Sequence, residues 1–493
     1  MDPTVLALDA GTTAITGVLF DADLRPLARA AREFPTAFPR PGWVEQDAAR
    51  LLAAVDEVLA ALFAAPAAAG VAAVGVTNQR ETVFALDRAR GKALRPGIVW
   101  QDRRTAARCR ALAAEGRGEL LAARTGLRAD PYFSATKIEW MLAEDPALRA
   151  RARRGEVVFA TVDSLVLHHL AGGGEWITDP TNASRTLLFD IDRRAWDGEL
   201  CALFGVEPGW LPAVRGSVGE LARTSPRRAG GRALPVTGLA GDQQAALFGQ
   251  GCFAPGALKA TFGTGSFLVL FTGAERVSSR RGLLTTLAVA RDGSAAYAME
   301  GSVFVSGALV QFLRDRLGWI ARAEEVEALA RTVPDSAGVF VVPAFTGLGA
   351  PYWDPDARGA ILGLTRGTTP AHIARASLEA IAFQNAELIE ILREESGWEV
   401  PSLLADGGAA RNDLLLSLQA DLAGLEVRRP PDVEATARGA AALAALGAGL
   451  LADPARAGAF AEPLDSFRPS LGAADRGARL AAWREAVGRV LTR

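Results

Sequence analysis

The fold can be inferred from the first segment of the chain, Thr4-Val5-Leu6-Ala7-Leu8-Asp9-Ala10-Gly11-Thr12-Thr13-Ala14-Ile15-Thr16-Gly17-Val18-Leu19-Phe20. Two apolar runs, residues 4–8 and 15–20, flank a short segment rich in Gly and Thr. This pattern is typical of two buried strands joined by a tight turn. The turn begins with Asp9, so a carboxylate stands where the first strand ends.

The segments that follow set the fold class. Residues 27–34 predict a third strand, 47–63 an amphipathic helix with leucines and valines at helical spacing, and 71–76 a further buried strand. Three hairpin-connected strands and then alternating helix and strand indicate a mixed α/β layer fold. The first turn carries neither a GxGxxG fingerprint nor a Walker GxxxxGK[ST] loop.

The second half of the chain repeats the opening pattern. A strand-like run ends in Phe262-Gly263-Thr264-Gly265-Ser266, and residues 267–271 form the returning strand. A Gly-Thr turn is by itself a good hairpin turn, but two such turns can hold a polyphosphate with backbone N–H groups and hydroxyls. We therefore favour phosphate binding and a duplicated fold, with domains at residues 1–250 and 251–493.

Composition excludes several classes of function. The net charge of −2 and the pI near 6.1 show no excess of positive charge of the kind that binds nucleic acid or an anionic membrane. The three cysteines are widely spaced, which fits a reducing cytoplasm. Met1-Asp2-Pro3-Thr4 lacks the basic residues of a signal peptide, and the weakly charged run 439–452 is too short to span a bilayer. We expect a cytoplasmic protein without membrane insertion.

Histidine is scarce, so a histidine-rich metal site is not expected. Two of the three histidines, His168 and His169, adjoin each other in an apolar, helix-like segment. We interpret this pair as core or surface filler.

Near the middle of the chain, Gly241-Asp242-Gln243-Gln244 follows the apolar run 233–237. A carboxylate and two amides at a strand end are costly to bury without partners, which points to a functional site. The alternative is that Asp242 caps the following helix by accepting backbone N–H bonds.

Seven segments together resemble the FGGY family of carbohydrate kinases, and within it the glycerol-phosphorylating branch. They are residues 75–82, 99–104, 132–140, 179–186, 240–250, 345–354 and 359–379, and the resemblance extends over nearly the whole chain. It implies an actin-like ATPase (ribonuclease H-like) fold of two domains, each a mixed five-stranded sheet flanked by helices. The active site would lie in the cleft between them.

The resemblance also implies an activity. The ATP γ-phosphoryl group would pass to a primary hydroxyl of glycerol, giving sn-glycerol 3-phosphate and ADP. Asp242 would act as the general base, and Asp9 and Asp242 would hold Mg²⁺. One alternative is an FGGY kinase for another polyol or a ketose. Another is an actin-like protein that uses ATP as a conformational switch, although such a protein has no use for a polyol site.

Residue roles follow from the same resemblance. The positions that match the glycerol site are Arg80, Glu81, Trp100, Tyr132, Asp242, Gln243 and Phe267. Those that match the nucleotide site are Thr12, Thr13, Ala14, Thr16, Gly263, Thr264, Gly307, Gln311, Gly408 and Asn412. We expect glycerol and ATP as the small-molecule partners, no nucleic acid, and a homodimer or homotetramer.

Two departures from the family pattern are expected to matter. Ala14 lacks the hydroxyl, and Thr16 the arginine charge, that well-known members present to the nucleotide, so weaker ADP and ATP binding is expected. In the segment where some bacterial members bind fructose 1,6-bisphosphate, Ala233 occupies the arginine position. Feedback control at this segment is therefore doubtful.

Overall fold

The computed structural model describes residues 2–431, 434–457 and 464–492. The chain divides into two compact units. Unit 1 comprises Met1–Phe253, Thr285–Tyr297 and Thr436–Ala461, and unit 2 comprises Ala254–Leu284, Ala298–Ala435 and Glu462–Arg493.

Unit 1 is built on a six-stranded sheet with the order β14-β15-β6-β1-β2-β3. Its strands are β1 (Thr4–Ala10), β2 (Ala14–Phe20), β3 (Pro26–Glu33), β6 (Val71–Asn78), β14 (Val218–Arg223) and β15 (Pro235–Gly241). The predicted meander β1-β2-β3 is confirmed as antiparallel, and β6 and β15 continue the sheet in parallel with β1. The sheet exceeds the expected five strands because β14 pairs antiparallel with the edge of β15.

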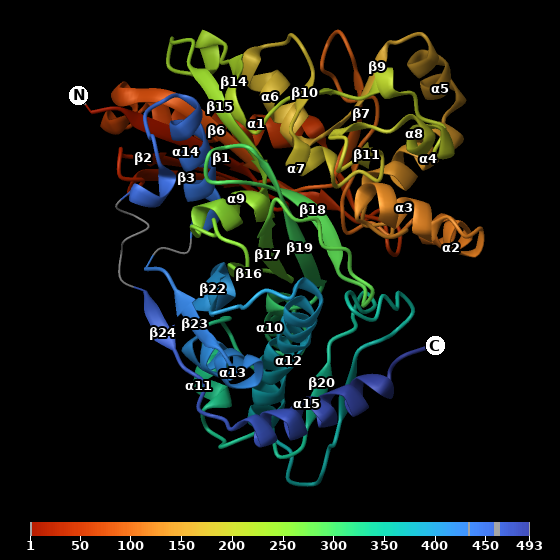
Figure 1. Cartoon of the computed structure of the whole chain (residues 1–493), viewed down its shortest axis with the longest axis vertical. Helices are drawn as coiled ribbons and strands as arrows, with labels where there is room; N and C mark the ends of the chain where they lie inside the picture. Colours follow the sequence, from red (N-terminus) through yellow and green to blue (C-terminus); the bar gives the residue numbers. More distant parts are fainter. Residues whose placement is uncertain (1, 432–433, 458–463, 493) are drawn as a thin grey trace. The chain divides into compact units, whose positions relative to one another are not determined.

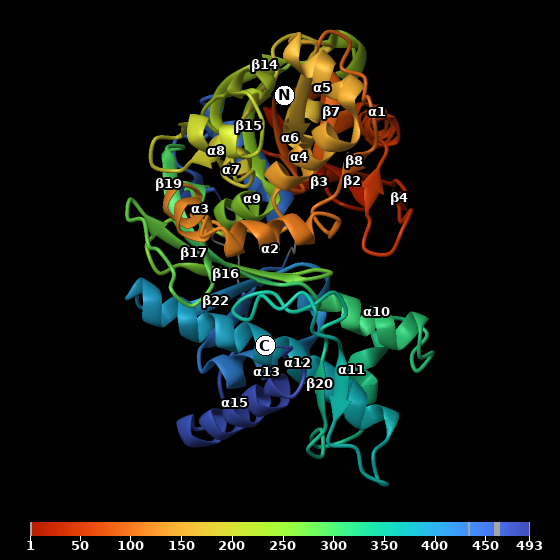
Figure 2. The same cartoon turned by 90° about the vertical axis from the view of Figure 1, so that its right-hand side faces the viewer.

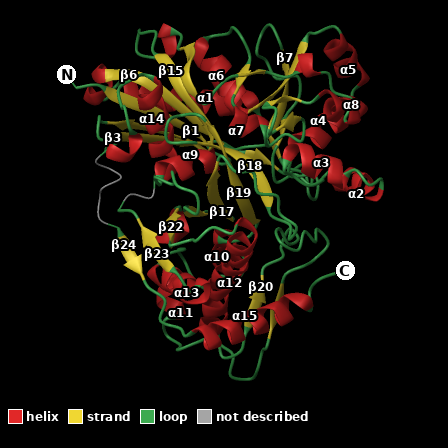
Figure 3. Ribbon diagram, viewed as in Figure 1, coloured by secondary structure: helices red, strands yellow, loops and turns green. Residues whose placement is uncertain are grey.

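Helices cover both faces of this sheet because its strands alternate apolar side chains between the two faces. Leu6 and Leu8 pack in one core with helix α1 (Ala48–Phe63) and helix α6 (Val162–Ala171). Val5 and Ala7 pack in a second core with helices α9 (Asp242–Gly249) and α14 (Ala435–Gly447). Figures 1 and 3 show these helices beside the strands of the sheet.

The remaining elements of unit 1 include a five-stranded sheet with the order β4-β5-β8-β7-β9. Its strands are β4 (Thr36–Ala37), β5 (Glu45–Gln46), β7 (Val83–Asp87), β8 (Gly97–Ile98) and β9 (Val157–Thr161). The helices are α2 (Ala106–Ala114), α3 (Gly118–Thr125), α4 (Ser134–Glu144), α5 (Pro146–Arg153), α7 (Pro180–Ala183) and α8 (Gly198–Leu203). Two short ladders pair β10 (Ile177–Thr178) with β13 (Ala213–Val214), and β11 (Phe189–Asp190) with β12 (Ala195–Trp196).

A second large sheet has seven strands in the order β18-β19-β17-β16-β22-β23-β24. They are β16 (Leu258–Phe262), β17 (Ser266–Gly273), β18 (Leu284–Val289), β19 (Ala295–Val303), β22 (Ser402–Asp406), β23 (Glu426–Arg429) and β24 (Asp465–Phe467). The predicted second hairpin is confirmed as β16-β17, and β22 runs parallel to β16. Additional strands at the edges, such as the antiparallel β24, again exceed the expected five.

Helices of unit 2 pack against one another beside its strands. The long helix α12 (Pro370–Ser396) contacts α13 (Asp413–Ala423), and both contact α15 (Ala473–Gly488), as Figure 2 shows. The other elements are α10 (Gly307–Asp315), α11 (Glu325–Ala330), β20 (Phe340–Val342) and β21 (Ala360–Leu362). Among the described residues, no helix is long and apolar enough to cross a bilayer.

Close backbone packing joins α14 to the first sheet. A Cβ atom built on Gly75 of β6 would lie 2.1 Å from the backbone oxygen of Ala440, and one on Gly439 would lie 1.8 Å from that of Ala245. Because backbone atoms cannot move aside as a flexible side chain can, only glycine fits at these two positions.

We expect Gly75→Ala to destabilise unit 1 by about 1–3 kcal/mol, since overpacking forces α14 away from the strand. The measurement is the thermal unfolding midpoint. Gly118→Ala is the matched control, because a Cβ there meets nothing within 4 Å. Equal midpoints for the two variants would contradict the close packing of α14.

Candidate active site

Parallel strands bring the polar segments of unit 1 to one edge of the sheet. Asp9 of β1 is opposite Thr77 of β6, and Thr77 is opposite Ala240 of β15. The chain leaves this edge through the turn after Asp9, through residues 79–82 and through the start of α9. The carboxyl ends of parallel strands are where α/β sheets place their ligands.

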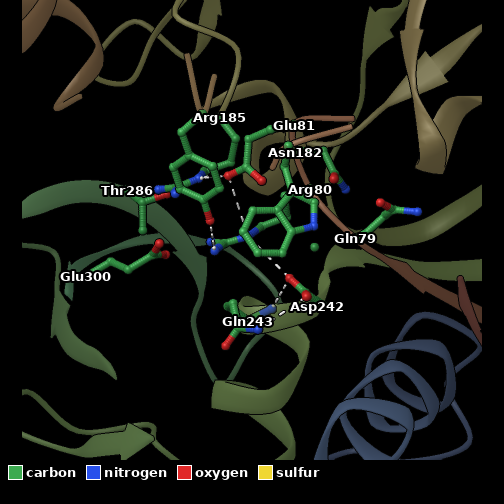
Figure 4. A network of polar contacts seen from close by, with 12 residues as sticks. Gln79, Arg80, Glu81, Asn182, Arg185, Asp242, Gln243, Thr286 and Glu300 are labelled. Carbon is green, nitrogen blue, oxygen red and sulfur yellow. Dashed lines mark hydrogen bonds and ion pairs between the residues drawn. The ribbon is translucent and has the colours of Figure 1, made fainter. Parts of the chain in front are cut away.

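Arg80 lies at the centre of the predicted polyol positions (Figure 4). Its side chain is 2% exposed, and its Nε lies 3.2 Å from Asp242 Oδ1. Its Nη2 lies 3.5 Å from the Tyr132 hydroxyl. The amide of Gln243 donates to Asp242 Oδ2 at 3.2 Å. The structure thus brings together four predicted residues from three segments that are far apart in the sequence.

Asp242 does not cap helix α9. The N-cap position is taken by Gly241, and Asp242 is the first residue of the helix. Its Oδ1 accepts a bond from the Gln243 backbone N–H at 2.8 Å, and its side chain is 31% exposed. The capping hypothesis is therefore wrong, and the backbone bond instead orients a carboxylate that solvent can reach.

Gln244, whose role the sequence left open, anchors Arg80. Its Oε1 accepts from Arg80 Nη1 at 3.3 Å. Its amide nitrogen donates to the Leu287 carbonyl at 3.0 Å and lies 3.3 Å from the Thr286 hydroxyl. Because its amide nitrogen is bonded to β18, Gln244 holds the Arg80 guanidinium at a nitrogen other than the one that contacts Asp242.

Trp100 connects the polyol positions to the first Gly-Thr turn. Its ring lies 5.7 Å from that of Tyr132 in an edge-to-face arrangement. Its indole N–H donates to the Thr12 hydroxyl at 2.9 Å. The turn itself is held by Gln46, which donates to the Thr12 carbonyl at 2.7 Å, and by Gln79, which donates to the Gly11 carbonyl at 3.0 Å.

The other positions predicted for nucleotide on this turn follow Thr12. Thr13 is exposed, and Ala14 and Thr16 lie partly buried in β2. Thr16 is opposite Asp9 across the hairpin, so any side chain at this position adjoins the carboxylate that ends β1.

A buried pair of asparagine side chains stabilises this edge of the sheet. Asn78 and Asn182 exchange side-chain hydrogen bonds of 2.9 and 3.1 Å. Asp179 accepts from the Asn182 amide at 2.9 Å and from the Thr181 hydroxyl at 2.7 Å. The Thr181 oxygen in turn accepts from the Gly241 N–H at 2.8 Å. The network fixes the backbone immediately before Asp242.

Lys137 is fully buried beneath the site, and its Nζ donates to the Tyr132 carbonyl at 2.9 Å. Burial lowers the pKa of its ammonium group from 10.5 to about 8, against the opposing effect of the nearby carboxylates of Asp102, Glu81 and Asp130. Sequence reasoning assigned no role to Lys137, because a lysine in a helix is usually a surface residue.

In unit 2, six predicted nucleotide positions line one cavity of about 470 Å³. They are Gly263, Thr264, Gly307, Gln311, Gly408 and Asn412. Cavities of this size commonly hold small-molecule ligands. Four charged residues of the lining were not predicted, because no sequence motif marks them: Arg314, Glu324, Glu327 and Arg411.

Three further sequence positions have a clear place. Phe267 lies partly buried in β17 of unit 2. His168 stacks on Trp176 with ring centroids 3.8 Å apart, which confirms a packing role. The Nε2 atom of His169 lies 2.8 Å from Asp56 and 2.9 Å from Arg228 Nε, contacts that the sequence did not predict.

The two halves of the chain together define a kinase. The model of the N-terminal domain of the FGGY family of carbohydrate kinases matches residues 4–249, and that of the C-terminal domain matches residues 258–448. The chain belongs to this family.

Individual relatives extend the comparison. Glycerol kinase of Aromatoleum aromaticum is 51% identical to this chain, with 98% of each chain covered. The crystal structure of Plasmodium falciparum glycerol kinase with ADP is 30% identical, with a TM-score of 0.89 over 100% of this chain and 99% of that chain. Xylulose kinase from Rhodospirillum rubrum is 25% identical, with a TM-score of 0.83 over 98% of both chains.

The pKa of Lys137 predicts a pH dependence of stability. Between pH 8 and 10.5 the unfolded chain holds a proton at Lys137 that the folded chain releases. The free energy of unfolding should therefore rise with pH in this window, by about 3 kcal/mol in total, and Lys137→Met should lack this rise.

Urea denaturation at several pH values measures the effect. The exposed Lys92 supplies the control, since Lys92→Met should keep the wild-type pH profile. A Lys137→Met profile parallel to that of the wild type between pH 8 and 10.5 would contradict the shifted pKa.

Proposed function

We propose that this chain is an ATP-dependent glycerol kinase that transfers the γ-phosphoryl group of ATP to a primary hydroxyl of glycerol, giving sn-glycerol 3-phosphate and ADP. The observation that carries the proposal is the contact of Arg80 with Asp242 and Tyr132, with Glu81 and Gln243 adjoining. A small polyol offers only hydroxyl groups and a short carbon chain. A hydroxyl both donates and accepts hydrogen bonds, and this cluster supplies acceptors and donors for it.

The acceptor substrate is selected through hydrogen bonds. Arg80 and Gln243 supply N–H donors, Glu81 supplies acceptors, and the rings of Trp100 and Phe267 would contact the carbon chain. A ligand that leaves such buried groups unpaired loses about 1–3 kcal/mol for each group. The site therefore favours a substrate with a hydroxyl on each carbon.

Asp242 would accept the proton of the attacking hydroxyl. Its carboxylate is partly exposed and is oriented by the Gln243 N–H and by Arg80. In phosphoryl transfer the hydroxyl becomes acidic as its bond to phosphorus forms, so a well-placed carboxylate suffices as the base.

The nucleotide would be held by both Gly-Thr turns. Thr12, Thr13, Ala14 and Thr16 would adjoin the phosphates, with Gly263 and Thr264 in the second turn. The cavity of unit 2, lined by Gly307, Gln311, Gly408 and Asn412, has a size that suits adenosine.

Asp9 and Asp242 fit a Mg²⁺ site. Both end or follow strands at the same sheet edge, with only β6 between β1 and β15. Within the described ranges, no group of three or more histidine, cysteine or carboxylate ligands gathers for a metal. Two carboxylates suit Mg²⁺, which usually keeps several waters and takes phosphate oxygens as its other ligands. Once bound, the ion would neutralise charge on the phosphates.

The alternative of a ketose or larger polyol as substrate rests on the likeness to xylulose kinase. The identity to the glycerol kinases is higher over the same share of the chain. A switch protein without an acceptor substrate would leave the buried charges of the Arg80 cluster without a use. Both observations favour glycerol.

Two further parts of the proposal concern the protein in the cell. Use of ATP, together with three buried free cysteines, favours the cytoplasm. A homodimer or homotetramer remains our prediction. Arg232 adjoins Ala233, which occupies the position of the family's arginine. The Arg232 side chain donates to the Ala68 carbonyl at 2.6 Å, so a role for it in feedback by a sugar bisphosphate stays doubtful.

Asp242→Asn should lower kcat about 10²–10⁴-fold, because the amide cannot accept the proton. ADP release is measured with glycerol, with a panel of polyols and ketoses, and without acceptor. Asp23→Asn, on the exposed turn between β2 and β3 and outside the proposed site residues, is the matched control. Near-normal turnover by Asp242→Asn would refute the mechanism, and faster turnover of a ketose than of glycerol would refute the substrate.

Thr16→Arg should tighten ADP binding several-fold, because it adds a positive charge beside the phosphate turn. Calorimetric titration with ADP measures this, and Thr16→Gln separates the charge from the length of the side chain. Unchanged affinity in Thr16→Arg would show that this departure from the family pattern has no consequence for the nucleotide.

A further inference from the structure

Four charged side chains meet at the proposed glycerol site: Arg80, Glu81, Arg185 and Asp242. Arg80 lies 3.2 Å from Asp242 but 3.9 Å from Glu81, measured from its Nε to the nearest carboxylate oxygen. Arg185 Nε lies only 2.7 Å from Glu81 Oε1. The shorter contacts therefore pair Arg80 with Asp242 and Arg185 with Glu81 (Figure 4).

Burial makes this pairing consequential. The Arg185 side chain has no exposed surface, and those of Arg80 and Glu81 are 2% exposed. Charges at such depth attract one another much more strongly than at the surface. Removal of one partner leaves an uncompensated buried charge, which is far more costly than loss of a surface pair.

The backbone fixes both members of the second pair. Glu81 has a positive φ of 63°, a conformation that non-glycine residues rarely adopt. Its carbonyl accepts from the Ser134 hydroxyl at 2.8 Å, which holds the strained residue in place. Arg185 follows α7, where its N–H bonds to the Asn182 carbonyl at 3.0 Å.

Arg185 also adjoins a second residue of the proposed site. Its guanidinium carbon lies 5.5 Å from the centroid of the Tyr132 ring and 5.3 Å from that of Phe133. A guanidinium at this distance from an aromatic ring is attracted to it. One buried side chain therefore contacts two of the residues that would bind glycerol, without belonging to the predicted set itself.

We propose that Arg185 is a positioning residue that keeps Glu81 away from Arg80. By holding Glu81, it leaves the Arg80 guanidinium directed at Asp242 and presents the Glu81 carboxylate to a substrate hydroxyl. Without Arg185, the Glu81 carboxylate, now 3.9 Å from Arg80 Nε, would move closer and form an ion pair with Arg80. Neither residue would then be available to bind the substrate. The inference rests on the proposed glycerol site and deepens it.

The test compares Arg185→Gln, Arg185→Lys and the wild type. Arg185→Gln should raise the KM for glycerol 10- to 100-fold while the KM for ATP changes less than twofold. Arg185→Lys keeps the charge but not the planar fork, so it should recover part of the loss. Arg151→Gln is the control, since it removes a guanidinium 2.8 Å from Asp87 outside the site and should leave both constants unchanged.

A double-mutant cycle with Glu81→Gln separates positioning from general stability. In the Glu81→Gln background, Arg185→Gln should raise the KM for glycerol less than threefold further, because the carboxylate it restrains is already neutral. If Arg185 were only structural, the two substitutions would raise the KM for glycerol independently, and the two fold-changes would multiply. Independent losses, or a lower melting temperature with an unchanged KM for glycerol, would overturn the proposal.

Two outcomes keep this test distinct from the proposed function. If the wild type does not phosphorylate glycerol, the proposed function fails. If the wild type is active and Arg185→Gln is not recovered in folded form, Arg185→Lys decides, with circular dichroism to establish folding. A folded Arg185→Lys with wild-type KM for glycerol and for glycerol analogues that lack one hydroxyl would refute the role of the guanidinium fork.

Discussion

The contact between Arg80 and Asp242 is the interaction on which the site depends. It joins the loop after β6 to the first residue of α9, two segments that are distant in the sequence and adjacent at the sheet edge. An arginine that is almost fully buried must be compensated, and the surrounding groups are arranged for that purpose. Gln244 accepts a hydrogen bond from its Nη1, and the Asn78–Asn182 pair belongs to the network that fixes the backbone immediately before Asp242.

The same edge of the sheet combines buried supporting residues with a carboxylate that solvent can reach. The residues that support the site are buried, whereas Asp242 keeps about a third of its side chain open to solvent. A residue proposed as a general base must be reachable by its substrate, but its orientation must not depend on the substrate alone. The backbone bond from Gln243 and the contact with Arg80 meet this requirement before any ligand binds.

Small residues make the arrangement possible. Gly75 and Gly439 let α14 lie directly on the sheet and on α9, so the helix that begins with Asp242 is packed from both sides. The cavity of unit 2 is also lined by glycines, and at one of them, Gly307, a Cβ atom would lie 2.6 Å from the backbone oxygen of Gly263. Close backbone approach is what a ligand with phosphate groups and a flat base requires.

Local sequence patterns predict the two Gly-Thr hairpins and the mixed sheet of unit 1, and the family resemblance points to most of the residues of the candidate site. These features are local, because strand alternation and turn chemistry are written in neighbouring residues. Sequence reasoning misjudged the cap of α9 and the number of strands and did not predict the partners of His169, since distant segments contribute to each sheet edge and to each side-chain contact. Only the tertiary structure decided that Arg185 lies against Glu81, that Gln244 anchors Arg80 and that Lys137 is buried, because the partners of a buried charge come from segments far away in the chain.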